Sequence, residues 1–156
     1  MKKTTIILAL LMIILSCSTE NSQKQQTGEE IIFGEVYGQC AGDCRNLYLL
    51  TEEGIYEDSN SDSEFGNWED TTFENQALPL EKFDLAKSLL QIPEKLLEPN
   101  GEIGNQTLAD FDYFIQVKIN GESKIWVFDE LKENTDSEIK NYIDKLIDIN
   151  NQLRNY

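Results

Sequence analysis

The sequence FDYFIQVKINGESKIWVF, residues 111–128, decides the fold because it specifies one β-hairpin together with its register. Asn120-Gly121 at its centre supplies the positive φ angles of a two-residue type I′ turn. The turn makes residues face each other in the pairs Ile119 with Glu122, Val117 with Lys124, Ile115 with Trp126, and Tyr113 with Phe128. One face of the hairpin is therefore strongly apolar. The opposite face carries more apolar residues than a fully solvated face normally shows, so we expect another segment to cover it. These residues are Phe114, Ile125 and Val127.

The chain before this hairpin predicts three further strands and one helix. Residues 31–39 and 47–50 are rich in β-forming side chains, and residues 55–56 follow a Glu-Glu-Gly turn. Residues 81–91 place apolar side chains at helical spacing, and Pro93 ends that helix or begins a short second turn.

A second helix is predicted after the hairpin. Thr135-Asp-Ser-Glu138 has the sequence of a capping box, with Thr135 at the cap and Glu138 three residues later. One helical face then runs to the C-terminus through Ile139, Tyr142, Ile143, Leu146, Ile149 or Asn150, and Leu153. The element order βββαββα favours an α+β fold, an antiparallel sheet of about five strands with two helices packed on one face. We expect this single domain to occupy residues 31–156.

The N-terminus predicts export. Lys2 and Lys3 precede an apolar run over residues 6–15, which is too short to span a membrane and is typical of a signal peptide. The sequence Ile14-Leu15-Ser16-Cys17 resembles the lipobox of bacterial lipoproteins. This resemblance implies that residues 1–16 are cleaved and that Cys17 carries diacylglyceryl and, usually, a further acyl chain such as palmitate. An ordinary secretory signal is the alternative.

Lipidation of Cys17 would anchor the protein to a membrane of the cell envelope, because several acyl chains on one residue bind stably. Ser18, rather than Asp, follows the cysteine and resembles the pattern sent to the outer membrane if the cell is Gram-negative. Residues 17–30 contain no large apolar side chain after the cysteine, so we expect a lipidated flexible tether with the folded domain beginning near Ile31.

Composition excludes several classes of function. The formal net charge is −16, which repels nucleic acid and anionic head groups and attracts cations or basic partners. The chain has no histidine, which excludes Ser-His-Asp and Cys-His catalysis and histidine-ligated zinc or copper. No catalytic constellation and no cofactor motif stands out, and the sequence leaves the oligomeric state open.

Cys40 and Cys44 form an even pair once Cys17 is lipidated. In an oxidising compartment we expect a structural disulfide that shapes the loop between the first two strands. A thiol redox centre and copper delivery are alternatives. Active dithiols usually lie at a helix N-terminus, whereas strand is predicted after Cys44, and the known copper chaperones with this spacing add a histidine.

Residues 58–69 match part of a calcium-binding loop. The oxygen ligands would come from Asp58, Asn60, Asp62, Glu64 and Glu69. Ser63 stands where the sharp turn favours glycine, and a strand rather than a helix precedes the loop. A solvated acidic loop is therefore the preferred interpretation, with calcium binding as the alternative.

The polar segment 57–76 also contains three aromatic residues, Phe65, Trp68 and Phe73. They are predicted to pin the segment onto the second face of the 111–128 hairpin. The alternatives are an exposed binding loop, since Trp and Phe often supply binding energy, and a short extra strand around residues 68–73.

The element order from Ile31 to Leu153 is similar to that of small inhibitors of bacterial metalloproteases, the emfourin type. It also resembles small lipoproteins of uncharacterised function with a cysteine pair between their first strands. We interpret the chain as a membrane-tethered lipoprotein with a non-enzymatic binding domain. The alternatives are a periplasmic protease inhibitor, a calcium-binding surface protein and a thiol redox protein.

Overall fold

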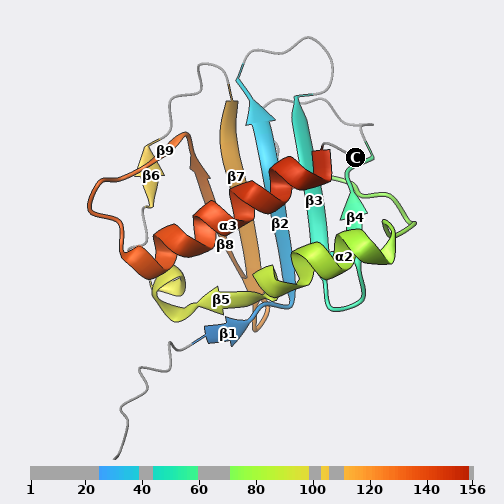
Figure 1. Cartoon of the computed structure of the whole chain (residues 1–156), viewed down its shortest axis with the longest axis horizontal. Helices are drawn as coiled ribbons and strands as arrows, with labels where there is room; N and C mark the ends of the chain where they lie inside the picture. Colours follow the sequence, from blue (N-terminus) through green and yellow to red (C-terminus); the bar gives the residue numbers. More distant parts are fainter. Residues whose placement is uncertain (1–24, 39–43, 60–70, 99–102, 106–110, 155–156) are drawn as a thin grey trace, which may run out of the picture.

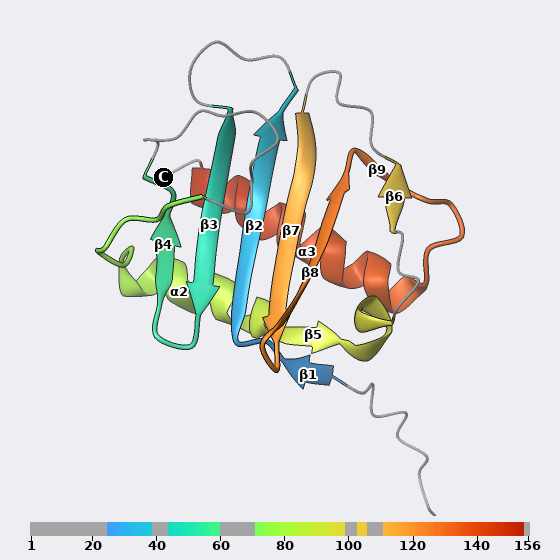
Figure 2. The same ribbon diagram turned by 180° about the vertical axis from the view of Figure 1, so that it is seen from behind.

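The computed structural model describes residues 25–38, 44–59, 71–98, 103–105 and 111–154. Its centre is a five-stranded antiparallel sheet with the strand order β4-β3-β2-β7-β8. The strands are β2 (Glu30–Tyr37), β3 (Arg45–Thr51), β4 (Ile55–Glu57), β7 (Phe111–Ile119) and β8 (Glu122–Phe128). The helices α2 (Leu80–Ala86) and α3 (Ser137–Arg154) lie on one face of the sheet (Figure 1), and Figure 2 shows the opposite face. The α+β class predicted from the sequence is confirmed.

The 111–128 hairpin has the predicted turn and register. Asn120 and Gly121 have φ angles of 54° and 77°. All four predicted pairs, from Ile119 with Glu122 to Tyr113 with Phe128, are present in the ladder between β7 and β8. The type I′ turn therefore sets which side chains of β8 face the helices.

Two small two-stranded sheets lie outside the main one. At one end of the molecule, β1 (Gln25–Thr27) pairs with β5 (Gln91–Pro93) (Figure 1). Beside the end of β8, β6 (Gly104–Asn105) pairs with β9 (Glu130–Leu131). The strand β1 lies within the segment expected to be a flexible tether, so the ordered part already includes Gln25. Backbone pairing with β5 orders these polar residues. The sequence does not predict this pairing, because the segment has no apolar side chain.

The helix predicted over residues 81–91 is shorter than expected. After Ala86 the chain tightens into the 3₁₀ helix η3 (Lys87–Leu90), and β5 then follows in extended conformation. Pro93 disfavours helical conformation for the residue before it, which accounts for the extended Ile92. A second 3₁₀ helix, η4 (Glu94–Leu97), follows Pro93, in the place where a short second turn was predicted.

The long helix α3 has the predicted buried face but a different cap. Asn150 is completely buried, and the six other residues of that face are also buried. The helix begins at Ser137, and Asp136 Oδ1 accepts the backbone N–H of Glu138 at 2.9 Å. Thr135 instead donates its hydroxyl to the carbonyl of Ile103 at 3.2 Å. The predicted cap at Thr135 is therefore wrong, because Asp136 supplies a nearer acceptor for the first turn.

The apolar core has two parts, one on each face of the sheet. The larger part fills the space between the sheet and the helices and includes Ile31 and Phe33 of β2. The smaller part on the opposite face contains Ile32, Val36, Cys44, Leu47 and Phe114. Successive residues of β2 thus point to opposite faces, as in any strand, and both faces carry apolar contacts.

Candidate functional site

The predicted lipidation and disulfide residues are only partly described. Cys17 and Cys40 lie outside the described residues. Cys44 is 5% exposed, precedes β3 and packs in the smaller apolar cluster. It is disulfide-bonded rather than a free thiol, but its partner is outside the described part, so the pairing with Cys40 stays a prediction.

The aromatic segment contributes one described contact. Phe73 is half-buried against the cluster that contains Phe114, and it forms an isolated antiparallel bridge with Asp58. The backbone N–H of Ser59 donates to Thr72, and that of Glu74 donates to Glu57, both at 2.9 Å. Residues 72–74 therefore extend the β4 edge of the sheet. Phe65 and Trp68 lie in the undescribed segment 60–70, so their role as a binding loop stays a prediction.

Asp58, one of the predicted calcium ligands, makes a structural contact. Its carboxylate Oδ2 accepts the backbone N–H of Leu47 at 2.7 Å, and its own N–H donates to the Leu47 carbonyl at 3.0 Å. The residue is 3% exposed, so this carboxylate holds β3 in place. The other four predicted ligands, Asn60, Asp62, Glu64 and Glu69, are not among the described residues. Within the described ranges, no group of three His, Cys, Asp or Glu side chains could hold a metal ion.

The opposite edge of the sheet, formed by β8, is the candidate binding site that the structure adds. In a two-residue hairpin the residues flanking the turn exchange hydrogen bonds, and alternate pairs beyond them do so as well. The backbone groups of Ser123, Ile125 and Val127 therefore point away from β7. In the described part of the chain, no backbone hydrogen bond engages them on that side. Ile125 is 37% exposed and lies at the centre of this row.

The same edge already binds an extended segment at its upper end. Asp129, the next residue in the alternation, donates its N–H to the carbonyl of Asn105 in β6 at 2.8 Å. The two edges of the sheet thus differ, since β4 has three residues and is extended by the Phe73 bridge, whereas β8 has seven. The β8 edge is the longer template for strand pairing.

A hollow of about 190 Å³ lies beside the start of β8. Its apolar lining comes from Leu97, Val117 and Ile119, and Glu122 and Lys124 line it from β8 itself. Lys124 donates from Nζ to the carbonyl of Leu97, which ties the strand to η4. The hollow is larger than the roughly 150 Å³ cavity that admits benzene in an engineered protein core, so it can receive one aliphatic side chain.

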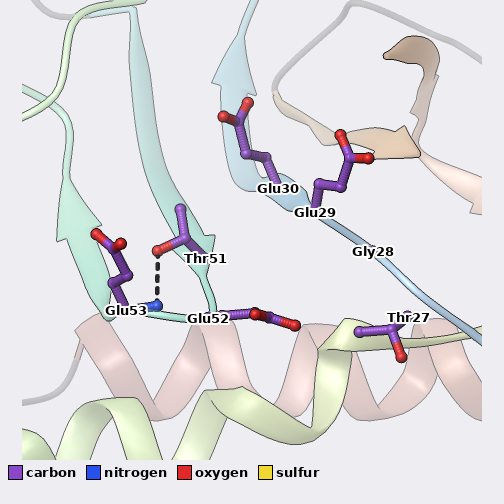
Figure 3. A pocket seen from close by; sticks show the side chains of 7 residues that line it. All are labelled: Thr27, Gly28, Glu29, Glu30, Thr51, Glu52 and Glu53. Atoms are coloured by element: carbon purple, nitrogen blue, oxygen red, sulfur yellow. Dashed lines mark hydrogen bonds between the residues drawn. The ribbon is translucent and has the colours of Figure 1, made fainter. Parts of the chain in front are cut away.

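A second hollow, of about 470 Å³, is acidic (Figure 3). It lies between the start of β2 and the turn from β3 to β4, and four carboxylates line it, those of Glu29, Glu30, Glu52 and Glu53. Glu30 pairs with Lys118 at 3.2 Å, and the Glu29 carboxylate accepts the backbone N–H of Asn120 at 3.0 Å. Because three of these four glutamates are exposed, the hollow is a solvated acidic depression at the β1 end of the molecule.

A buried polar cluster surrounds Glu35, which is 3% exposed in the middle of the sheet. Its carboxylate accepts hydrogen bonds from Asn150 Nδ2 at 3.1 Å, Arg154 at 2.5 Å and the Tyr37 hydroxyl at 3.0 Å. These contacts bind the last two turns of α3 to β2. The amide oxygen Oδ1 of Asn150 is buried and has no hydrogen-bond partner among the residues that the structure describes. Sequence reasoning missed this cluster, although a lone acid within the apolar strand 31–36 was its signal.

Burial and neighbouring carboxylates raise the pKa of two tyrosines near this cluster. Burial, and then the carboxylate of Glu57, raises the pKa of Tyr48 to about 12. Burial, followed by the Glu35 carboxylate, raises the pKa of Tyr113. A raised pKa makes a phenol a weaker acid and leaves almost no phenolate at neutral pH, so neither group is tuned for proton transfer.

The comparisons with known proteins give no relative. No family model, no curated protein and no solved structure matches this chain. Among the described residues, no helix is both long enough and apolar enough to cross a membrane.

Proposed function

We propose that this chain is a lipid-anchored, non-enzymatic binding protein of the bacterial cell envelope, attached through the lipid on Cys17 and binding a protein partner. The lipobox-like sequence supports the anchor. The observation that carries the binding function is the β8 edge, where three residues direct backbone groups outward that have no backbone partner among the described residues, beside the exposed Ile125. Edge strands of this kind bind other chains by strand addition.

The place where the chain enters the domain supports an orientation for this protein. Gln25 begins β1 at the end of the molecule that also carries the turn between β3 and β4 (Figure 1). Glu29, Glu52 and Glu53 at this end would be repelled by anionic head groups. The lipid would therefore hold the domain near the membrane without drawing its acidic end onto the surface, and the β8 edge would stay accessible from the side.

A photo-crosslinking amino acid placed at Ile125 in the full-length chain tests the binding function in cells. We expect one discrete adduct with a protein partner. The matched control places the same group at Gln152, an exposed position in the last turn of α3, which lies toward β3 and β4 at the other side of the sheet (Figure 1). Equal adducts at both positions, or none at Ile125, would contradict the proposal. Protease inhibition, calcium binding and thiol redox activity stay predictions, each testable by a direct assay.

A further inference from the structure

We propose that the β8 edge binds an extended segment of a partner protein that has apolar side chains at alternate positions and basic side chains between them. This inference deepens the proposed function by naming the class of partner, and it rests on that function. The segment adds a strand beside β8 and places one apolar side chain in the hollow lined by Leu97, Val117 and Ile119.

The outward backbone groups of β8 fix where the segment binds. Ser123, Ile125 and Val127 offer an N–H and a C=O each on the outer side of β8, at the spacing of an antiparallel or parallel ladder. At the next outward position, the N–H of Asp129 already donates to the carbonyl of Asn105 in β6. The edge therefore pairs with an extended segment there. An added strand would continue the line of β6 toward the hairpin tip.

The hollow beside β8 sets the apolar half of the pattern. In an added strand, alternate side chains point to the helix side of the sheet, where the hollow beside Glu122 and Lys124 lies. The intervening side chains point to the other face, beside Ile125 and Val127. Strand addition commonly obtains its specificity from such pockets for alternate residues.

Charge selects the basic half of the pattern. The chain has a net charge of −16, and Glu122 and Glu130 are exposed at the two ends of the edge, so the overall negative field attracts a basic segment without a carboxylate beside each of its basic side chains. Lys124 is directed inward to the carbonyl of Leu97. A basic segment is therefore attracted to this edge, whereas a second copy of the same acidic chain is repelled.

The test uses the purified full chain in a zwitterionic detergent and a short synthetic peptide of alternating lysine and valine. Hydrogen exchange followed by mass spectrometry should show the 122–128 segment protected on addition of the peptide, with exchange slowed roughly tenfold or more at saturation. Affinity should fall as salt is raised. A glutamate–valine peptide, and a lysine–valine peptide with N-methylated backbone nitrogens, should both fail to protect the segment.

A matched pair of variants separates backbone pairing from general attraction. Ser123→Pro removes one outward N–H and no bond to β7, whereas Ser123→Ala keeps it. We expect at least a tenfold weaker affinity for the proline variant and an unchanged affinity for the alanine variant, with both melting as folded proteins.

Three results would overturn the inference: no binding of the lysine–valine peptide, binding that Ser123→Pro leaves unchanged, and protection of 122–128 without peptide that depends on protein concentration, which would identify a second copy as the occupant. Loss of lipid on Cys17 would refute the anchor alone and leave this result intact. Failure of peptide binding would likewise leave the anchor standing.

Discussion

Glu35 shows how a single residue joins two elements that are distant in sequence. Its carboxylate accepts hydrogen bonds from three side chains, two of them in the last two turns of α3. The partners Asn150 and Arg154 lie more than one hundred residues later in the chain, so no local pattern could have predicted the cluster. The sequence does predict that position 150 falls near the buried face of the helix, but not what it binds.

Removing Glu35 should destabilise the fold more than removing Arg154. Glu35→Ala leaves the buried amide of Asn150 and the guanidinium of Arg154 unpaired, which we expect to reduce the free energy of unfolding by about 3 kcal/mol. The Arg154 side chain is 40% exposed, so Arg154→Ala should cost only about 1 kcal/mol. Urea denaturation measures both values. Equal losses would contradict the role of Glu35 as the centre of the cluster.

Gly34 and Gly121 both have positive φ angles but differ in their surroundings. A Cβ atom at Gly34 would lie 2.1 Å from the carbonyl oxygen of Asn46, whereas one at Gly121 would meet no atom within 4 Å. Gly121→Ala should therefore cost about 1 kcal/mol of backbone strain. Gly34→Ala should cost several times more, because β2 and β3 must separate. Thermal unfolding of the two variants checks the order, and a similar loss in both would be inconsistent with the close strand approach.

Tyr142 should make the protein sensitive to alkali. Its hydroxyl donates to the Leu89 carbonyl at 2.9 Å, and burial raises its pKa above the ordinary value near 10. The unfolded chain therefore loses this proton first, so stability is fully present below pH 10 and declines above it, by about 1.4 kcal/mol per pH unit. Tyr142→Phe should flatten the decline measured by urea unfolding between pH 9 and 11. An unchanged slope would show that this hydroxyl is not the cause.

At the scale of elements, the sequence predicts those features that residues close together in the chain determine. The Asn120-Gly121 turn fixed the register of β7 and β8, and the helical period placed the buried face of α3. The pairing of β1 with β5 could not be predicted in this way, because residues 25–27 are polar and their partners lie some sixty residues later. For the β8 edge, the sequence predicted only that one face of the hairpin carries more apolar residues than a solvated face normally does.

The cap of α3 gives a prediction at this scale. The Lys95 side chain and the N–H of Glu138 bind the Asp136 carboxylate and lower its pKa, so its contribution is present at neutral pH and is lost as the pH falls through the lowered pKa. Asp136→Ala should lower the melting temperature clearly, and Asp136→Asn should lower it less because asparagine is also a good cap. Thr135→Ala should have the smaller effect of the two alanine variants. The reverse order would restore the capping box predicted from the sequence.

At the scale of the whole molecule, the acidic hollow and the β8 edge lie in different places. The acidic hollow and β1 share one end, whereas β8 forms one side of the sheet (Figures 1 and 2). Under the proposed function, the net charge of −16 would keep the domain in solution while the lipid anchors it, and the β8 edge would be available to a basic partner. The fold class followed from the sequence, whereas the binding surface required the strand order.

The proposed location of the protein depends on lipidation of Cys17. Metabolic labelling with an alkyne fatty acid tests this lipidation most directly. The wild-type chain and the control Cys40→Ser should both carry label and fractionate with membranes. Cys17→Ser should carry none, because the acyl acceptor is gone, and should accumulate as the uncleaved precursor. Equal labelling of Cys17→Ser and the wild type would contradict the account.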